Sequence, residues 1–409
     1  MKTQSTLLGL AILFGLSGCK TETAAPKPSI AEKPVVSTEA PPPSQYPPKK
    51  APAIVHGKGL LQTSDWARLP DWQQTTLLPT WGTFLQGCQP LKQRPLWQEI
   101  CARAAAIERP DELTIRRFME NHFIPYQVVN ADGSTEGLAT GYYEPLLYGS
   151  RKPSSRFRYP IYAPPEDLLT IDLDNPHADS KSTLARGRLE GRKVVPYYTR
   201  AEIENNRNLL KGRELLWVED QVELFFLQIQ GSGRIVLENG EIVKIGYADH
   251  NGYPYRSIGK LLIEQGELAA WQASMQGIKR WGQQNPDKLE TLLQQNARFI
   301  FFRELPASLS GPVGALGVPL TAGRSLAIDP DSIPLGAPIY LATTWPNTSE
   351  PLNRLMVAQD TGSAIKGGVR ADFFWGYGKE AETQAGKMKQ PAKMWVLLPK
   401  KYRQQARKP

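Results

Sequence analysis

Apolar and polar positions change their spacing along the chain and divide it into blocks. Between residues 60 and 123 the apolar side chains recur at helical intervals, and Pro125 ends the last predicted helix. Beyond Gly137, short apolar runs alternate with glycine and proline, a pattern that predicts strands. The predicted strands of this block lie at 139–144, 159–162, 215–218, 224–230, 234–237 and 242–243.

Helical spacing returns after this first block of strands. It predicts helices at about 257–265 and 272–283, and a third helix that Asn285 caps and Pro286 begins. The remainder is again strand-like, with strands expected at 299–302, 326–328, 338–341, 355–358 and 394–398. Many short strands with flanking helices predict a mainly β fold, built on a small barrel or sandwich.

The N-terminus has a pattern of its own. Lys2 precedes an apolar run over 7–16 that is too short to span a bilayer, which predicts a signal peptide over residues 1–18. Cys19 follows Leu-Ser-Gly, which resembles the bacterial lipobox, so we expect Cys19 to be lipidated. The mature protein is then expected on the periplasmic side of the outer membrane. The segment 19–52 is rich in proline and poor in apolar residues, and this predicts an extended tether.

Composition and charge narrow the class of protein. The chain has 409 residues, 41% of them hydrophobic and 22% charged, which is globular and favours two cores over one. The formal net charge of +9 suits an anionic polymer or surface, with a solvated basic surface as the alternative. No nucleic-acid fold signature or dense basic run is present, so we expect no nucleic-acid partner.

The cysteines and histidines offer little metal chemistry. In an oxidising compartment Cys88 and Cys101 can pair, closing a loop worth about 3 kcal/mol in the chain-entropy picture. We favour this disulfide over two buried free thiols. The four histidines are scattered and show no metal-ligand spacing, so we expect no metal and no other cofactor.

The segment 356–378 holds the most informative chemistry. Asp360 and Asp372 lie twelve positions apart, and Asp372 runs directly into Phe373-Phe374-Trp375. Burial beside aromatic rings raises the pKa of a carboxyl group, and cleavage of an acetal needs such a protonated acid. A sugar-cleaving enzyme is therefore indicated. The alternatives are an Asx-turn at Asp360 and a salt bridge between Asp372 and Arg370.

Other motifs carry weaker signals. Residues 228–234 lead into a tight glycine turn whose N–H groups can face a ligand, with a plain hairpin turn as the alternative. Tyr142 and Tyr143 can stack on sugar rings or simply fill a sheet, and Glu144 is expected at the surface. Asp329 is expected to cap a turn.

Five ordered stretches of the chain match motifs of one known family. They are 140–145, 224–233, 246–259, 274–278 and 356–378. In them the sequence closely resembles the membrane-bound lytic murein transglycosylase A family. The resemblance extends over essentially everything after the proline-rich segment, and the lipobox is a further similarity.

This resemblance implies a fold and a division into domains. It implies a catalytic double-psi β-barrel domain made from two chain segments, with a second β-barrel domain inserted between them. We place the catalytic domain at 53–145 and 251–409 and the inserted domain at 146–250. The sugar-binding groove is then expected between the two domains.

The resemblance also implies an activity. The family cleaves the β-1,4 bond between N-acetylmuramic acid and N-acetylglucosamine in peptidoglycan, leaves a 1,6-anhydro ring and needs no metal. By its position in the motif, Asp372 is implied to act first as acid and then as base, and Asp360 is implied to support it. The candidate substrate contacts, which match family positions around the groove, are Tyr142, Tyr143, Gln230, Gly231, Ser232, Asp329 and Lys366.

The expected partners follow from this activity. They are peptidoglycan glycan strands, the membrane through the lipid anchor, and other cell-wall enzymes. Two alternatives stay open: a non-catalytic peptidoglycan-binding lipoprotein, and a muramidase-type hydrolase of the same bond.

Overall fold

The computed structural model describes residues 53–171 and 185–402. The signal peptide predicted at 1–18, the lipidation of Cys19 and the tether at 19–52 lie outside these described residues. None of the helices in the described ranges is both long enough and apolar enough to cross a bilayer.

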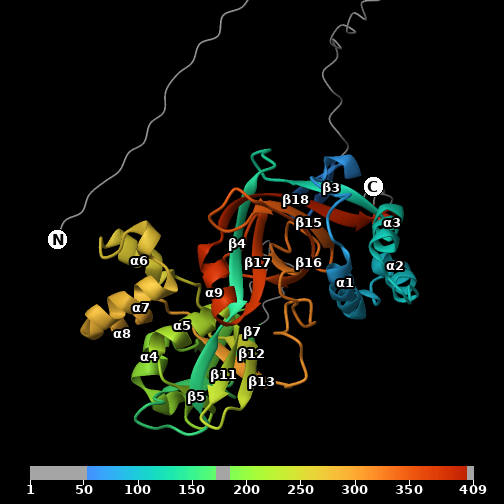
Figure 1. Cartoon of the computed structure of the whole chain (residues 1–409). Coiled ribbons are helices and arrows are strands. Elements are labelled where there is room, and N and C mark those ends of the chain that lie inside the picture. Colours follow the sequence, from blue (N-terminus) through green and yellow to red (C-terminus); the bar gives the residue numbers. More distant parts are fainter. Residues whose placement is uncertain (1–52, 172–184, 403–409) are drawn as a thin grey trace, which may run out of the picture. The chain divides into compact units, whose positions relative to one another are not determined.

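Six strands form a closed β-barrel (Figure 1). Each strand pairs with the next, and the last pairs back to the first. In ring order the strands are β18 (Lys389–Pro399), β15 (Pro338–Thr344), β16 (Pro351–Thr361), β14 (Ser325–Ile328), β17 (Arg370–Tyr377) and β4 (Gly137–Glu144). Their largely buried, β-branched and aromatic residues fit strands that enclose a core.

Three N-terminal strands extend this sheet from β18. They are β3 (Phe123–Val129), β2 (Gly59–Thr63) and β1 (Ala53–His56). The helical interpretation of residues 60–63 was therefore wrong. Leu61 is fully buried as β2 pairs with β3, so tertiary pairing decides the conformation of this short segment.

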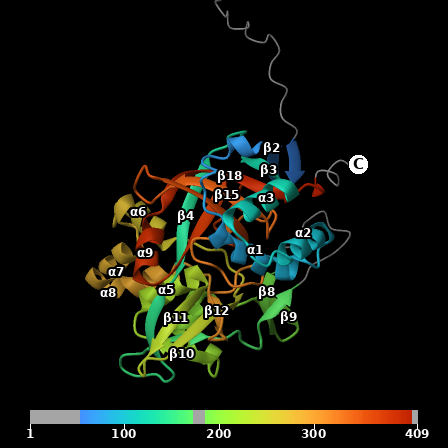
Figure 2. The same ribbon diagram turned by 45° about the vertical axis from the view of Figure 1, so that its right-hand side comes forward.

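Three helices pack against the barrel and share its apolar core. They are α1 (Leu78–Leu91), α2 (Pro95–Ala105) and α3 (Glu112–His122). Pro95 stands at the start of α2, and the carboxylate of Asp111 caps α3 by accepting from the Thr114 N–H. Helices are thus confirmed in this block, preceded by the short 3-10 helix η1 (Trp66–Arg68). Figure 2 brings these helices towards the viewer.

A second sheet of six strands follows β4 directly. Its order is β13 (Ile300–Leu305), β12 (Ile242–His250), β11 (Ser232–Leu237), β5 (Leu146–Ser150), β10 (Glu214–Val218) and β6 (Tyr159–Tyr162). It has an apolar core of its own. Residues 300–305, which the sequence analysis placed in the segment 251–409, belong to this sheet because β13 pairs with β12. No strand ladder among the described residues joins β6 to β13, so the pairing seen is that of an open sheet.

A small third sheet and two short helical turns complete this part of the chain. The sheet has the order β7 (Leu169–Ile171), β8 (Ala185–Glu190) and β9 (Lys193–Pro196), and Figure 2 shows the last two strands. Helix α4 (Arg200–Asn205) begins with a capping box between Thr199 and Glu202. The 3-10 helix η2 (Arg207–Leu210) follows it.

The segment 224–230 is helical, and its interpretation as a strand was wrong. It forms most of α5 (Gln221–Gln230), where the Asp220 carboxylate accepts from the N–H groups of Val222 and Glu223. Buried Val222 and Phe225 lie three residues apart on one helical face. The run of apolar residues after them hid this periodicity, because both faces of the helix are partly covered.

Helices α6 (Ile258–Glu264), α7 (Met275–Gln284) and α8 (Pro286–Gln294) pack with α5 in a third apolar core. The 3-10 helix η3 (Ala270–Gln272) precedes α7. These helices confirm the second helical block. Asn285 precedes α8 but makes no side-chain cap; its amide instead donates to the Trp281 carbonyl at 3.0 Å.

Helix α9 (Gly378–Lys387) lies against β4 and β17 (Figure 1). The described chain is thus a mixed arrangement of helices and strands rather than mainly β.

The expected disulfide is present and joins two of the barrel's helices. Cys88 on α1 and Cys101 on α2 are bonded, with their Cα atoms 5.4 Å apart, and both are buried. The two residues are 13 positions apart in the chain.

We expect reduction, or the double change Cys88→Ser and Cys101→Ser, to lower the free energy of unfolding by about 3 kcal/mol. Urea denaturation with and without reductant measures this. A wild-type midpoint that reductant leaves unchanged would contradict it.

Candidate active site

One row of residues crosses four strands of the barrel and holds both aspartates. Ala327 on β14 is the register partner of Asp360 on β16 and also of Asp372 on β17. On its other side Asp372 pairs with Thr140 on β4. Residues in register on neighbouring strands project from the same face of a sheet. The two aspartates therefore flank the small side chain of Ala327, with Cα atoms roughly 10 Å apart, or two strand spacings.

A β-bulge brings Asp360 into this row. Leu326 pairs with Ala358 and Ala327 pairs with Asp360, so Gln359 is an extra residue in β16. Gln359 is fully buried; its amide donates to the Thr83 carbonyl at 3.0 Å and accepts from the Ser325 hydroxyl at 2.6 Å. Since a shift of one residue exchanges the faces of a strand, this bulge places Asp360 on the face of Asp372.

Asp372 has the environment of a carboxylic acid with a raised pKa. Burial, and to a smaller extent the negative charge of Asp360, raise its pKa to about 6, against the opposing influence of the Thr140 hydrogen bond and of Arg370. The Thr140 hydroxyl donates to Oδ1 at 2.6 Å. Among the described residues Oδ2 has no hydrogen-bond partner. Arg370 donates to the Ala371 carbonyl and makes no ion pair with Asp372 in the described part, so the salt-bridge alternative is wrong.

Asp360 is held on both oxygens. The Ala315 N–H donates to Oδ1 at 3.0 Å, and the Tyr142 hydroxyl donates to Oδ2 at 3.0 Å. Burial raises the pKa of Asp360, while these hydrogen bonds oppose the rise. Tyr142 in turn packs against Phe374, with ring centroids 5.1 Å apart. Of the aromatics after Asp372, Phe374 thus reaches the site through Tyr142, whereas Phe373 lies in the barrel core.

Both aspartates line a groove of about 740 Å³ that the barrel and the second sheet enclose together. Four of the predicted contact residues also line it, namely Tyr142, Gln230, Gly231 and Ser232. The sequence analysis missed the polar residues of the second-sheet wall. They include Tyr247, His250, Tyr255, Arg298 and Arg303. Tyr247, His250 and Tyr255 lie within the family-like stretch 246–259 but were not singled out there, whereas Arg298 and Arg303 lie outside every motif of the sequence analysis.

The stretch Gln230-Gly231-Ser232 is a junction between helix and strand. Gly231 ends α5 with a φ of 77°, a left-handed conformation that glycine adopts without strain, and Ser232 begins β11. The plain hairpin-turn interpretation was therefore wrong. The Gln230 side chain points back towards β4, where its Oε1 accepts from the Tyr143 N–H at 3.3 Å.

Three of the predicted contacts lie outside the residues that line the groove. Tyr143 is buried, and its hydroxyl lies 3.5 Å from the Met275 sulfur. Asp329 accepts from the Gly367 N–H at 2.8 Å and from Lys366 at 3.4 Å. Asp329 and Lys366 therefore order the loop before β17, which itself contributes residues 362–365 to the groove.

Glu144 is not at the surface. Its side chain is 1% exposed and pairs with Arg234 at 2.8 Å, where β4 passes into the second sheet. Arg234 also lies over the Tyr377 ring, 3.5 Å from its centroid. The pair joins the barrel to the second sheet and does not line the groove.

In residues 53–171 and 185–402, no group of three or more His, Cys, Asp or Glu side chains could hold a metal ion.

The hydrogen bond and the neighbouring charge should shift the pKa of Asp372 in opposite directions. Thr140→Val removes a donor that favours the carboxylate, so the pKa should rise by roughly half to one pH unit. Asp360→Asn removes a negative charge and should lower it. Carbon-13 NMR titration of aspartate carboxyl groups measures both changes, and Thr383→Val on exposed α9 is the control. Shifts with reversed signs would contradict this description.

Comparisons with known proteins identify the family to which the chain belongs. It matches the MltA specific insert domain over residues 138–303 and the 3D domain over 324–398. The membrane-bound lytic murein transglycosylase A of Escherichia coli (strain K12) is 33% identical over 279 residues, which are 66% of this chain and 68% of that protein. MltA from Neisseria gonorrhoeae is 42% identical with a TM-score of 0.75, covering 86% of this chain and 95% of that one. E. coli MltA with bound chitohexaose is 26% identical with a TM-score of 0.62, covering 86% and 97%. The chain therefore belongs to the MltA family, the membrane-bound lytic murein transglycosylases A.

Proposed function

We propose that this protein is a lytic transglycosylase of peptidoglycan. It cleaves the β-1,4 bond between N-acetylmuramic acid and N-acetylglucosamine without water and leaves a 1,6-anhydromuramoyl end. Family membership supports the reaction, and the complex of the E. coli relative with chitohexaose supports a glycan in the groove. The observation that carries the proposal is Asp372. Its pKa of about 6, and an Oδ2 that has no partner among the described residues, suit a proton donor on the groove wall.

Asp372 acts first as the acid. Its proton passes to the glycosidic oxygen as the bond between that oxygen and C1 breaks. The bonding electron pair leaves with the oxygen, which departs as the 4-hydroxyl of N-acetylglucosamine. C1 of the muramoyl residue gains oxocarbenium character. Asp372 is left as a carboxylate, which the Thr140 hydrogen bond stabilises.

Asp372 then acts as the base. It accepts the proton of the muramoyl 6-hydroxyl while that oxygen donates an electron pair to C1 and closes the 1,6-anhydro ring. Asp372 is thereby protonated again, and no water is consumed. Because nucleophile and electrophile belong to one sugar ring, the closure has a high effective molarity. It requires neither a protein nucleophile nor a held water.

Asp360 supports this cycle and forms no bond to the sugar. Both of its oxygens accept hydrogen bonds, so it is an anchored charge rather than a free nucleophile. A negative charge there favours the protonated form of Asp372 before cleavage and stabilises oxocarbenium character at C1 during it. Tyr142 links the two by holding Asp360 and lining the groove beside Asp372.

The domain division follows as part of the proposal. We assign the six-stranded barrel as a catalytic double-psi barrel that two chain segments build, with the second sheet as a barrel-like insertion. The pairing of β13 and the match of the insert family to 138–303 support an insertion that ends near residue 305 rather than 250. The catalytic segments are then 53–145 and about 306–402.

Product analysis tests the activity. Incubation with purified sacculi should release 1,6-anhydromuramoyl products, seen by mass spectrometry. Asp372→Asn should reduce their release at least about 1,000-fold while chitohexaose binding persists, because the acid acts in the transition state. Asp360→Asn should retain a measurable rate, and exposed Asp287→Asn on α8 is the matched control. Wild type that binds sacculi without releasing products would instead favour a binding lipoprotein, and reducing-end products a hydrolase.

The membrane attachment is a separate part of the proposal. Cys19 carries the lipid that holds the protein on the periplasmic side of the outer membrane, near other cell-wall enzymes, and the names of the relatives as membrane-bound support it. Cys19→Ser removes the acceptor thiol. The variant should move from the membrane pellet to the soluble fraction on ultracentrifugation, as followed by immunoblotting. Retention in the pellet after a high-salt wash would contradict the anchor.

A further inference from the structure

The two walls of the groove carry opposite charges. Asp360 and Asp372 are the carboxylates that line it, and both lie on the barrel side. The cationic side chains that line it are Arg200, Arg298 and Arg303, from the other side. Each of these arginines either forms an ion pair within the protein or remains free to bind an anion. The contacts of each side chain decide between the two.

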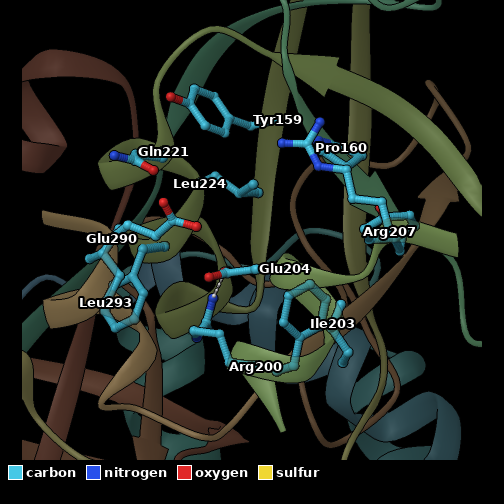
Figure 3. Close-up of a pocket in the computed structure, with 13 residues that line it drawn as sticks. Tyr159, Pro160, Arg200, Ile203, Glu204, Arg207, Gln221, Leu224, Glu290 and Leu293 are labelled. Carbon is cyan, nitrogen blue, oxygen red and sulfur yellow. Dashed lines mark hydrogen bonds and ion pairs between the residues drawn. The ribbon is translucent and has the colours of Figure 1, made fainter. Parts of the chain in front are cut away.

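Arg200 is already neutralised. Its guanidinium pairs with Glu204 at 3.0 Å, and Figure 3 shows this pair. The same group donates to the carbonyls of Asn296 and Arg298 at 3.0 and 2.7 Å and to the Gln228 side chain. Arg200 thus separates the groove from a smaller cavity of about 70 Å³ and has no capacity left for a ligand.

Arg298 and Arg303 have no carboxylate partner among the described residues. Arg298 donates to the Tyr253 carbonyl at 2.9 Å, which fixes the side chain but leaves its charge uncompensated. Burial lowers the pKa of Arg298. Arg303 makes no side-chain hydrogen bond or ion pair in the described part, and it is exposed. The nearby carboxylate of Asp249 is paired with Arg186 at 2.8 Å and does not neutralise either arginine.

Ser232 and His250 add neutral polar groups to the groove wall that carries these arginines. Ser232, Gly246 and Arg303 are register partners on the adjacent strands β11, β12 and β13. Gly246 has no side chain, and the Leu305 side chain lies beside it, 2.9 Å from where a Cβ would stand. Ser232 and Arg303 share this face of the sheet. His250 lines the same groove, and its Nδ1 accepts from the Gly252 N–H at 2.8 Å, so Nε2 carries the proton and is a further donor.

We infer that Arg298 and Arg303 form a carboxylate-binding site for the acidic substituent of the muramoyl residue. The inference rests on the proposed function. N-acetylmuramic acid carries a lactyl carboxyl group that is either free or linked to an acidic peptide, whereas chitohexaose carries no carboxylate. A guanidinium binds a carboxylate through two parallel hydrogen bonds. The site therefore makes the groove prefer carboxylate-bearing strands over uncharged ones.

Binding of three ligands tests this preference. In the full chain with Asp372→Asn, which prevents turnover, calorimetry compares chitohexaose, peptide-free glycan strands of peptidoglycan, and peptide-bearing strands. Arg303→Gln should lower the affinity for carboxylate-bearing strands relative to chitohexaose by about three- to tenfold. Arg298→Gln should act in the same direction, and the preference should weaken with salt. Arg207→Gln, which removes an equal charge beside the smaller cavity, is the control and should leave the ratio unchanged.

The outcomes separate the inference from the proposed activity. Dependence on Arg303 with peptide-free strands identifies the lactyl carboxylate as the ligand, and dependence only with peptide-bearing strands identifies the peptide. An unchanged ratio, or an equal loss for chitohexaose, overturns the inference. If the wild type forms no 1,6-anhydro product but Arg303→Gln still changes the affinity ratio between carboxylate-bearing strands and chitohexaose, the proposed activity is wrong and the carboxylate-binding site remains supported.

Discussion

The pairing of β14 with both of its neighbours is the constraint on which the site depends. This four-residue strand is buried throughout, parallel to β16 and antiparallel to β17. Its register sets the faces of Asp360 and Asp372, and a slip of one residue would turn a carboxylate into the apolar core at a cost of several kcal/mol. Buried Gln359 holds the bulge by bonding to Thr83 on α1, a helix that the disulfide ties to α2. The packing of α1 and α2 against the barrel and the placement of the two aspartates therefore depend on each other.

The environments of the two carboxyl groups divide their roles. Among the described residues, Asp372 has one donor and an open oxygen, and Asp360 has a donor on each oxygen. Burial raises both pKa values, yet only Asp372 is free to exchange a proton with a ligand. Across the groove, Arg298 and Arg303, which have no carboxylate partner among the described residues, present the opposite charge. Acid chemistry on one wall and anion recognition on the other then serve different parts of one proposed substrate.

Local patterns predicted the elements that depend on local chemistry. Helical spacing of apolar residues located α2 and α3, and short apolar runs between glycines and prolines located β4, β6, β10 and most barrel strands. The errors arose where tertiary contacts decide. Residues 59–63 form a strand because β3 offers a pairing edge, and 224–230 form a helix whose apolar side chains pack into two different cores. The segment 356–378 identified both aspartates, but the Gln359 bulge, the row through Ala327 and the scattered arginines of the far wall depend on strand register, which the sequence does not reveal.

The central claim is that Asp372 serves one sugar as acid and then as base, so that the muramoyl 6-hydroxyl replaces water at C1. Digestion of sacculi in water enriched in oxygen-18 tests it most directly. The account predicts that newly formed muramoyl ends carry no heavy oxygen at C1 and have the mass of the anhydro form. Incorporation of one oxygen-18 atom at C1 as the bond is cleaved would contradict it and identify a hydrolase.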